Sequence, residues 1–131
     1  MTGVCVWKWR IPYEVDFALD MPEGAEILTV QTQYQGTSDE QGALWALVDP
    51  TATPQKRLFR LVGTGVRGDR PGPYVGTFQL TGGSLVLHVF EARREQEANI
   101  ARAAPVASYS VPDAVFPAPP APGYQGAGFR S

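Results

Sequence analysis

The sequence predicts an all-β protein, a single small antiparallel β-sandwich or barrel of about seven strands. Up to Glu91, apolar and polar residues alternate with a period of two in one segment after another, which is the spacing of strands with one buried face. Glycine and proline residues separate these segments, and none of them has a helical pattern. With 131 residues, 44% of them hydrophobic, the chain can bury a core without cross-links.

The first two expected strands each have one apolar and one charged face. In residues 4–11 the basic side chains of Lys8 and Arg10 alternate with apolar ones, and Pro12 ends the strand. In residues 13–20 the apolar side chains alternate with carboxylates. These carboxylates are Glu14, Asp16 and Asp20. Because an acid–base pair needs two different environments, this single exposed face predicts a solvated surface rather than a catalytic pair.

The next three expected strands occupy residues 26–34, 43–49 and 56–63. The first alternates throughout, which places three apolar side chains on one face of the pleat. They are Leu28, Val30 and Tyr34. Residues 43–49 are apolar on both faces, which predicts a central strand. Residues 56–63 direct their charges toward solvent, and polar or glycine- and proline-rich loops connect all of these segments.

Three tryptophans raise the possibility of a stacking platform for bases or sugars. They are Trp7, Trp9 and Trp45. Each occupies a strand position whose periodicity points inward, so the sequence favours core packing over a platform.

Residues 74–91 predict a β-hairpin whose turn is formed by Gly82 and Gly83. The resulting register makes one continuous apolar face from three cross-strand pairs. These pairs are Leu80 with Leu85, Phe78 with Leu87, and Gly76 with Val89. The histidine at position 88 falls on the other face, opposite Thr77. Hydroxyl and amide neighbours satisfy a neutral imidazole, so we expect neither catalysis nor metal binding at His88.

The chain changes character after Glu91, so we divide it into a β domain (1–91), a short helix or linker (92–104) and an extended arm (105–131). Residues 92–104 contain strong helix formers. Residues 105–131 are rich in proline and glycine, which predicts an extended, polyproline-like arm. Four widely spaced aromatic residues suit an arm that lies along a partner's surface. They are Tyr109, Phe116, Tyr124 and Phe129.

Composition narrows the classes of function. The single cysteine, Cys5, excludes an internal disulfide and a cysteine cluster for zinc. The N-terminus does not have the pattern of a signal peptide, and no segment is as long as a membrane span, so we expect a soluble protein without a membrane partner. A net charge of −2 does not favour nucleic acid as a partner. No nucleophile–base pair is present, and we expect neither an enzyme nor a bound cofactor.

Basic residues are concentrated in residues 51–75. Opposite charges on neighbouring strands could pair across the sheet, or the arginines could form an anion site. The four candidate anion-binding residues are Arg57, Arg60, Arg67 and Arg70. Residues 63–68 (GTGVRG) match the dinucleotide-binding pattern, but the residues that follow cannot start the helix which that motif needs. Residues 67–69 spell the adhesion tripeptide RGD, which occurs often by chance.

Five segments taken together resemble a family of small proteins found in bacteriophage and bacterial genomes. They are WKW.IP, MPEGAEILTVQTQ, LWALVDP, RLFRLVGTG and YVGTFQLTGGSLVLHVFE. The resemblance covers about residues 4–91. It implies a phage-type origin, and because the family has no assigned activity it implies no site residues. The polar residues 35–42 and the extension after Glu91 depart from the family's pattern.

These observations lead to two hypotheses for function. The first is a non-enzymatic phage protein of the virion or of its assembly, of minor capsid or decoration type. Its C-terminal arm docks on a capsid subunit, another phage structural subunit or a second copy, in the virion or the host cytoplasm. The second is an early phage factor that binds a small anionic host molecule, such as a nucleotide, at the arginine-rich loop.

Overall fold

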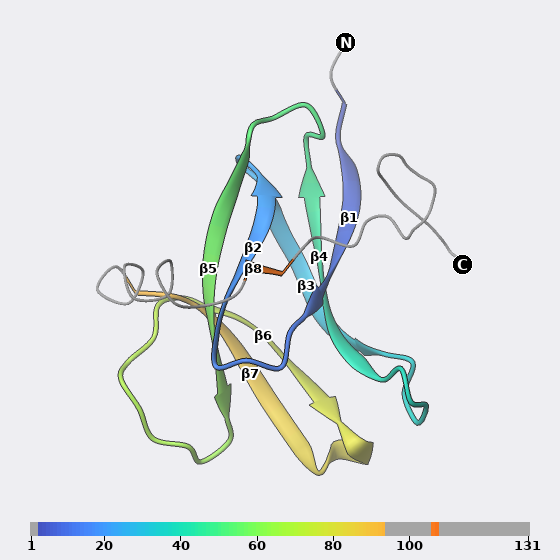
Figure 1. Cartoon of the computed structure of the whole chain (residues 1–131), viewed down its shortest axis with the longest axis vertical. Coiled ribbons are helices and arrows are strands. Elements are labelled where there is room, and N and C mark those ends of the chain that lie inside the picture. Colours follow the sequence, from blue (N-terminus) through green and yellow to red (C-terminus); the bar gives the residue numbers. More distant parts are fainter. Residues whose placement is uncertain (1–2, 94–105, 108–131) are drawn as a thin grey trace.

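Two β-sheets make up the part of the chain that the computed structural model describes, residues 3–93 and 106–107 (Figure 1). One sheet has three strands in the order β1-β4-β3 and the other has five in the order β6-β7-β5-β2-β8. Strands of the first sheet are β1 (Cys5–Ile11), β4 (Gln41–Val48) and β3 (Glu26–Gln33). Strands of the second are β6 (Tyr74–Leu80), β7 (Leu85–Glu91), β5 (Pro54–Gly63), β2 (Asp16–Pro22) and β8 (Val106–Ala107).

The predicted all-β class and the seven strands of the β domain are confirmed. Strands β1 to β7 pair only antiparallel, whereas the two-residue β8 runs parallel to β2. The two sheets pack as a sandwich and do not close into a barrel. Of the predicted C-terminal helix (92–104) and arm (105–131), only residues 92–93 and 106–107 lie within the described part of the chain.

Aromatic and aliphatic side chains from both sheets fill the space between them. Trp9 of β1, Phe17 of β2 and Phe59 of β5 are each 0% exposed. The Phe17 and Phe59 rings stack with their centroids 5.3 Å apart. Strand β4 lies in the middle of its sheet, as its apolar character on both faces predicts, and contributes Leu44 to the same core.

Hydrogen bonds join the two sheets at two places. The buried indole Nε1–H of Trp9 donates to the main-chain carbonyl of Asp20, at 3.0 Å, and so links β1 to β2. On the other side of the sandwich the Thr32 hydroxyl of β3 accepts a hydrogen bond from the Gln79 amide of β6, at 3.2 Å. Because a buried polar group without a partner costs free energy, the Trp9 contact fixes β1 against β2.

Two strand positions differ from the alternation that the sequence predicts. The β3–β4 register shifts between Ile27 and Thr29, which is a β-bulge. The bulge turns Leu28 outward, where it is 49% exposed, and lets Ile27 pack against the core with Val30. The prediction that Leu28 shares one face of the pleat with Val30 is therefore wrong, because the extra residue reverses the alternation.

Trp45 is the second difference. It lies between the buried Leu44 and Ala46 of β4 and pairs with Lys8 of β1, so it is on the outer face of the three-stranded sheet. Trp9 is a core residue and Trp7 packs partly against the core, as predicted. The inward placement of Trp45 is wrong because residues 43–49 are apolar on both faces, so periodicity cannot say which face is buried.

The hairpin of residues 74–91 has the predicted register from Gly76–Val89 to Leu80–Leu85. Gly82 and Gly83 have φ angles of 64° and 95°, within the short turn η1 (Thr81–Gly83), and the Ser84 amide donates to the Thr81 carbonyl at 3.2 Å. Positive φ at both central residues is the geometry of a type I′ turn, which glycine adopts without strain.

Hydroxyl groups satisfy both nitrogens of His88. Its Nδ1 is 2.9 Å from the Thr77 hydroxyl, the neighbour that the register predicts, and its Nε2 is 2.8 Å from the Thr64 hydroxyl. The ring is thus part of a local hydrogen-bond chain on the outer face of β7.

We predict that Gly42→Ala destabilises the protein by about 2 kcal/mol through overpacking. A Cβ at Gly42 would lie 2.4 Å from the ring of Phe78, which is 4% exposed and cannot move away freely. Urea denaturation measures the change in unfolding free energy. Gly68→Ala is the control, since nothing lies within 4 Å of its Cβ, and equal stability of the two variants would contradict the close packing at Gly42.

Candidate functional site

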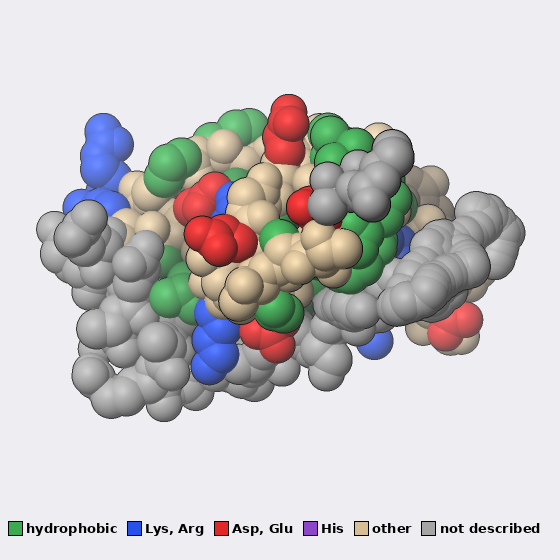
Figure 2. All heavy atoms as spheres, turned by 90° about the horizontal axis from the view of Figure 1, so that it is seen from above, with side chains coloured by type: hydrophobic (Ala, Val, Ile, Leu, Met, Phe, Trp, Pro, Cys, Tyr) green, Lys and Arg blue, Asp and Glu red, His purple; other side chains and the backbone are tan. Residues whose placement is uncertain are grey.

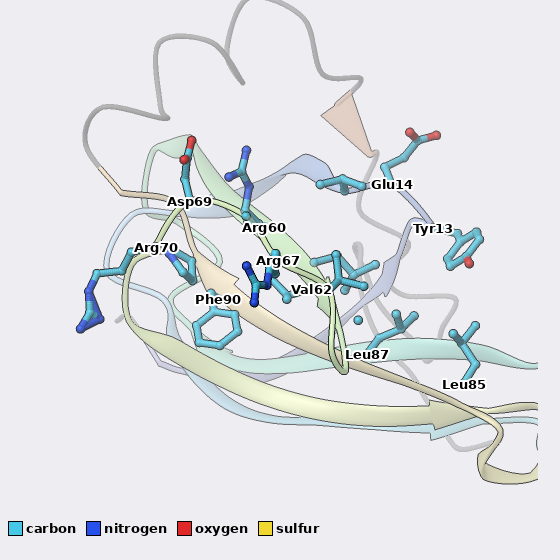
Figure 3. Close-up of a pocket in the computed structure, with 16 residues that line it drawn as sticks. Tyr13, Glu14, Arg60, Val62, Arg67, Asp69, Arg70, Leu85, Leu87 and Phe90 are labelled. Atoms are coloured by element: carbon cyan, nitrogen blue, oxygen red, sulfur yellow. The ribbon is translucent and has the colours of Figure 1, made fainter.

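A hollow of about 580 Å³ opens beside the loop that connects β5 to β6 (Figure 3). Its walls come from three places: the link between β1 and β2, the end of β5 with the following loop, and strand β7. The lining residues are Tyr13, Glu14, Val15, Arg60, Leu61, Val62, Gly63, Val66, Arg67, Gly68, Asp69, Arg70, Pro71, Leu85, Leu87 and Phe90. A volume of this size is typical of sites for small organic ligands.

Backbone hydrogen bonds hold the β5–β6 loop at both ends. The Thr64 amide donates to the Val86 carbonyl at 3.3 Å, and the Gly72 amide donates to the Glu91 carbonyl at 2.8 Å. Between these anchors, residues 66–70 are exposed and lie over the hollow. Strand β6, and no helix, follows residues 63–68, as the sequence predicts, so GTGVRG lacks the helix that the dinucleotide-binding motif needs.

The link between β1 and β2 is also fixed. The Leu61 amide of β5 donates to the Val15 carbonyl at 2.7 Å, which extends the β2–β5 ladder by one residue. This bond keeps Tyr13 and Val15 at the rim of the hollow, where their side chains are 72% and 64% exposed. The alternation in residues 13–20 predicts that Val15 points inward with Phe17. Val15 instead lies just before β2 begins, at Asp16, and its side chain is exposed.

Part of the exposed apolar surface lies at this hollow. Three large apolar residues at its rim are more than half exposed, and half-buried Leu85 and Phe90 continue the apolar surface inward. The three are Tyr13, Val15 and Val66. The sequence does not predict this grouping, because Val66 comes from a loop and the alternation of residues 13–20 predicts that Val15 is buried. Apolar patches of this kind mark binding surfaces.

The positive charge of Arg60 is neutralised by the carboxylate of Asp16 on the neighbouring strand. Its Nε and Nη2 atoms donate to the two carboxylate oxygens of Asp16, at 2.7 and 3.1 Å, in a bidentate pair directly across β2 and β5. Hydrogen bonding to Asp16, with a smaller contribution from Asp69, raises the pKa of Arg60 above its ordinary value. The predicted pairing of opposite charges across neighbouring strands is confirmed at this position.

Arg67 differs from Arg60 in having no such partner. Its side chain is exposed, and it makes no hydrogen bond or ion pair with the residues of the described part of the chain. Figure 3 shows its guanidinium over the hollow, close to Phe90 and Val62, whereas Arg70 extends outward from the rim. Arg67 is therefore the cation best placed to meet a ligand inside the hollow.

Arg57 does not belong to this site. It lies three residues before Arg60 on β5, so the two side chains point to opposite faces of the sheet. Arg57 donates to the Ala25 carbonyl at 2.8 Å and pairs with Glu91 at 3.1 Å. Of the four predicted anion-binding arginines, three thus line one hollow. The predicted partner-binding aromatics lie outside the described residues: Tyr109, Phe116, Tyr124 and Phe129.

The opposite end of the molecule is acidic. Figure 2 looks onto this end, where the β2–β3 and β4–β5 turns lie side by side and carboxylates gather on the surface. The Glu23 amide donates to the Thr53 carbonyl at 2.8 Å and so joins the two turns. Hydrogen bonds from the Thr51 hydroxyl and amide lower the pKa of Asp49. Carboxylates at this end disfavour an anion there.

Two other classes of site are absent from residues 3–93 and 106–107. This part of the chain contains no group of three or more histidine, cysteine or carboxylate side chains placed to hold a metal ion. It also contains no helix long and apolar enough to cross a membrane.

Similarity to known proteins places the chain in a family. The sequence profile of a domain of unknown function, DUF7352, matches residues 4–100. The chain belongs to the DUF7352 family. The match includes strands β1 to β7 of the DUF7352 domain and every residue that lines the hollow. No curated protein and no solved structure matches the chain. The expected membership of a family without assigned activity is confirmed, while the phage origin stays a prediction.

We predict a coupling free energy of about 1 kcal/mol between Asp16 and Arg60 in a double-mutant cycle with Asp16→Asn and Arg60→Gln. The pair is bidentate and its side chains are only 32% and 20% exposed, so solvent screens it less than a surface pair. Urea denaturation of the four proteins gives the coupling. A cycle of Asp16→Asn with the distant Arg10→Gln is the control and should be additive. Additivity in both cycles would contradict the pairing.

Proposed function

We propose that the protein is a non-enzymatic binding protein whose DUF7352 domain holds a small anionic molecule in the hollow beside the β5–β6 loop. The observation that carries this proposal is the placement of Arg67, an exposed cation without a partner in the described residues, over a hollow with a largely apolar lining. A ligand with an apolar body and an anionic group fits both features. This is the second of the two functions expected from the sequence.

The fixed walls of the hollow support binding. The loop is anchored at Thr64 and Gly72, and the β1–β2 link is anchored through Val15, so a ligand does not have to order these segments. Preorganised walls lower the entropic cost of binding. A non-enzymatic role is supported by His88, whose two ring nitrogens are both engaged by threonine hydroxyl groups.

We predict that Val66→Asp weakens the binding of small apolar anions about 10-fold or more, because it places a carboxylate at the rim of the hollow. Val66 is 65% exposed, so the substitution should leave the fold intact. Isothermal titration calorimetry with a panel of organic anions, nucleotides included, measures the effect. Arg10→Gln on the outer face of β1 is the control. If Val66→Asp and Arg10→Gln bind the panel as the natural sequence does, the hollow is not the site.

A second candidate function is the virion-associated or assembly role expected from the C-terminal arm. Its support is β8, which joins Val106 and Ala107 to the edge of the five-stranded sheet next to β2. The segment that follows β8 carries Tyr109, Phe116, Tyr124 and Phe129. In this role it docks on a phage structural subunit or on a second copy.

For this second role we predict that removing residues 108–131, which leaves β8 in place, abolishes incorporation into phage particles. Each aromatic residue that the partner buries contributes about 1–3 kcal/mol, so losing four of them removes most of the affinity. Quantitative immunoblotting of purified particles measures incorporation. A variant with serine at the four aromatic positions is the matched control for chain length. Undiminished incorporation of both variants would exclude this role.

A further inference from the structure

The charges around the hollow restrict the chemistry of its ligand beyond the proposed function, on which this inference rests. Three arginines stand at the site: Arg60, Arg67 and Arg70. Three carboxylates accompany them: Glu14 and Asp69 in the lining, and Asp16 in its bidentate pair with Arg60. The site as a whole is therefore electrically neutral. A neutral site offers no net attraction to a ligand with several negative charges.

The three arginines also differ in whether their guanidinium groups are available to bind a ligand. Arg60 is committed to Asp16, and breaking that pair to bind a ligand would leave the partly buried carboxylate without its partner. Arg70 extends away from the hollow and already has an interaction of its own. Arg67 remains, so the hollow provides one guanidinium for one anionic group.

The remainder of the lining is apolar. Val62, Leu85 and Leu87 lie on one side of Arg67 and Phe90 lies on its other side (Figure 3). Val15 and Val66 also belong to the apolar part of the lining. Burying a ligand's apolar body against these side chains supplies most of the favourable free energy, while the single ion pair orients the ligand.

We infer that the ligand of the hollow is a hydrophobic carboxylate: an apolar chain or ring with one negative charge, its carboxylate paired with Arg67. A phosphate monoester carries close to two negative charges at neutral pH, and nucleoside di- and triphosphates carry more. The neutral site disfavours them because the charges beyond the first find no further cation there that is without a partner in the described residues. The expected ligand is therefore a hydrophobic carboxylate and not the nucleotide that the sequence alone suggests.

The test compares three probes by isothermal titration calorimetry on the full chain: phenylbutyrate, its neutral analogue phenylbutyramide, and adenosine monophosphate. Phenylbutyrate is expected to bind at least about 5-fold more tightly than either other probe, because one charge-assisted hydrogen-bonded pair distinguishes it from the amide. Arg67→Gln should reduce phenylbutyrate to the affinity of the amide and leave the amide unchanged. Arg10→Gln should change neither, and Arg60→Gln is avoided because it also removes the pair with Asp16.

The outcomes separate this inference from the proposed function. If adenosine monophosphate binds more tightly than phenylbutyrate and loses affinity with Arg67→Gln, the hollow binds anions but the carboxylate inference is overturned. The same conclusion follows if the amide binds as tightly as the carboxylate while Val66→Asp weakens both. If none of the three probes binds, or if Val66→Asp changes the affinity of none, both the inference and the proposed function are overturned.

Discussion

The hydrogen bond from the Trp9 indole to the Asp20 carbonyl is the contact on which the arrangement of the two sheets depends. Trp9 is fully buried, and a buried indole N–H without an acceptor costs about 1–3 kcal/mol. Its acceptor lies on β2, in the other sheet, so the bond holds β1 against β2. The sheets meet again where Thr32 contacts Gln79, at the opposite side of the sandwich. Two contacts on opposite sides fix the relative position of two layers.

The hollow follows from this arrangement. Because β1 and β2 are fixed against each other, the short link between them must cross from one sheet to the other, and its Val15 carbonyl bonds to Leu61 of β5. The Asp16–Arg60 pair then begins one residue later. The β1–β2 link and the β5–β6 loop both line the hollow, and apolar side chains make up much of the lining between them. The core and the site therefore share the same strands, and the site requires no segment beyond the family's domain.

Sequence patterns predicted the parts of this protein that depend on local chemistry. Paired glycines set the hairpin turn and its register, so the pairing of Thr77 with His88 could be predicted. Because side chains alternate along β5, Arg57 and Arg60, which are three residues apart, must lie on opposite faces. The prediction of one anion site from four arginines close in sequence did not use this alternation. The bulge at Leu28 and the outward position of Trp45 could not be predicted, because both depend on which face meets the other sheet. The hollow itself depends on long-range packing, which residue periodicity does not encode.

Hydrogen exchange of the tryptophan indole protons, followed by two-dimensional NMR, tests the central contact most directly. The account predicts that the Trp9 Hε1 proton exchanges only through global unfolding, because it is buried and bonded to Asp20. Trp45 is the internal reference: it lies on an outer face and has no hydrogen-bond acceptor in the described residues, so its Hε1 should exchange rapidly. Exchange of the Trp9 proton as fast as that of Trp45 would contradict the account.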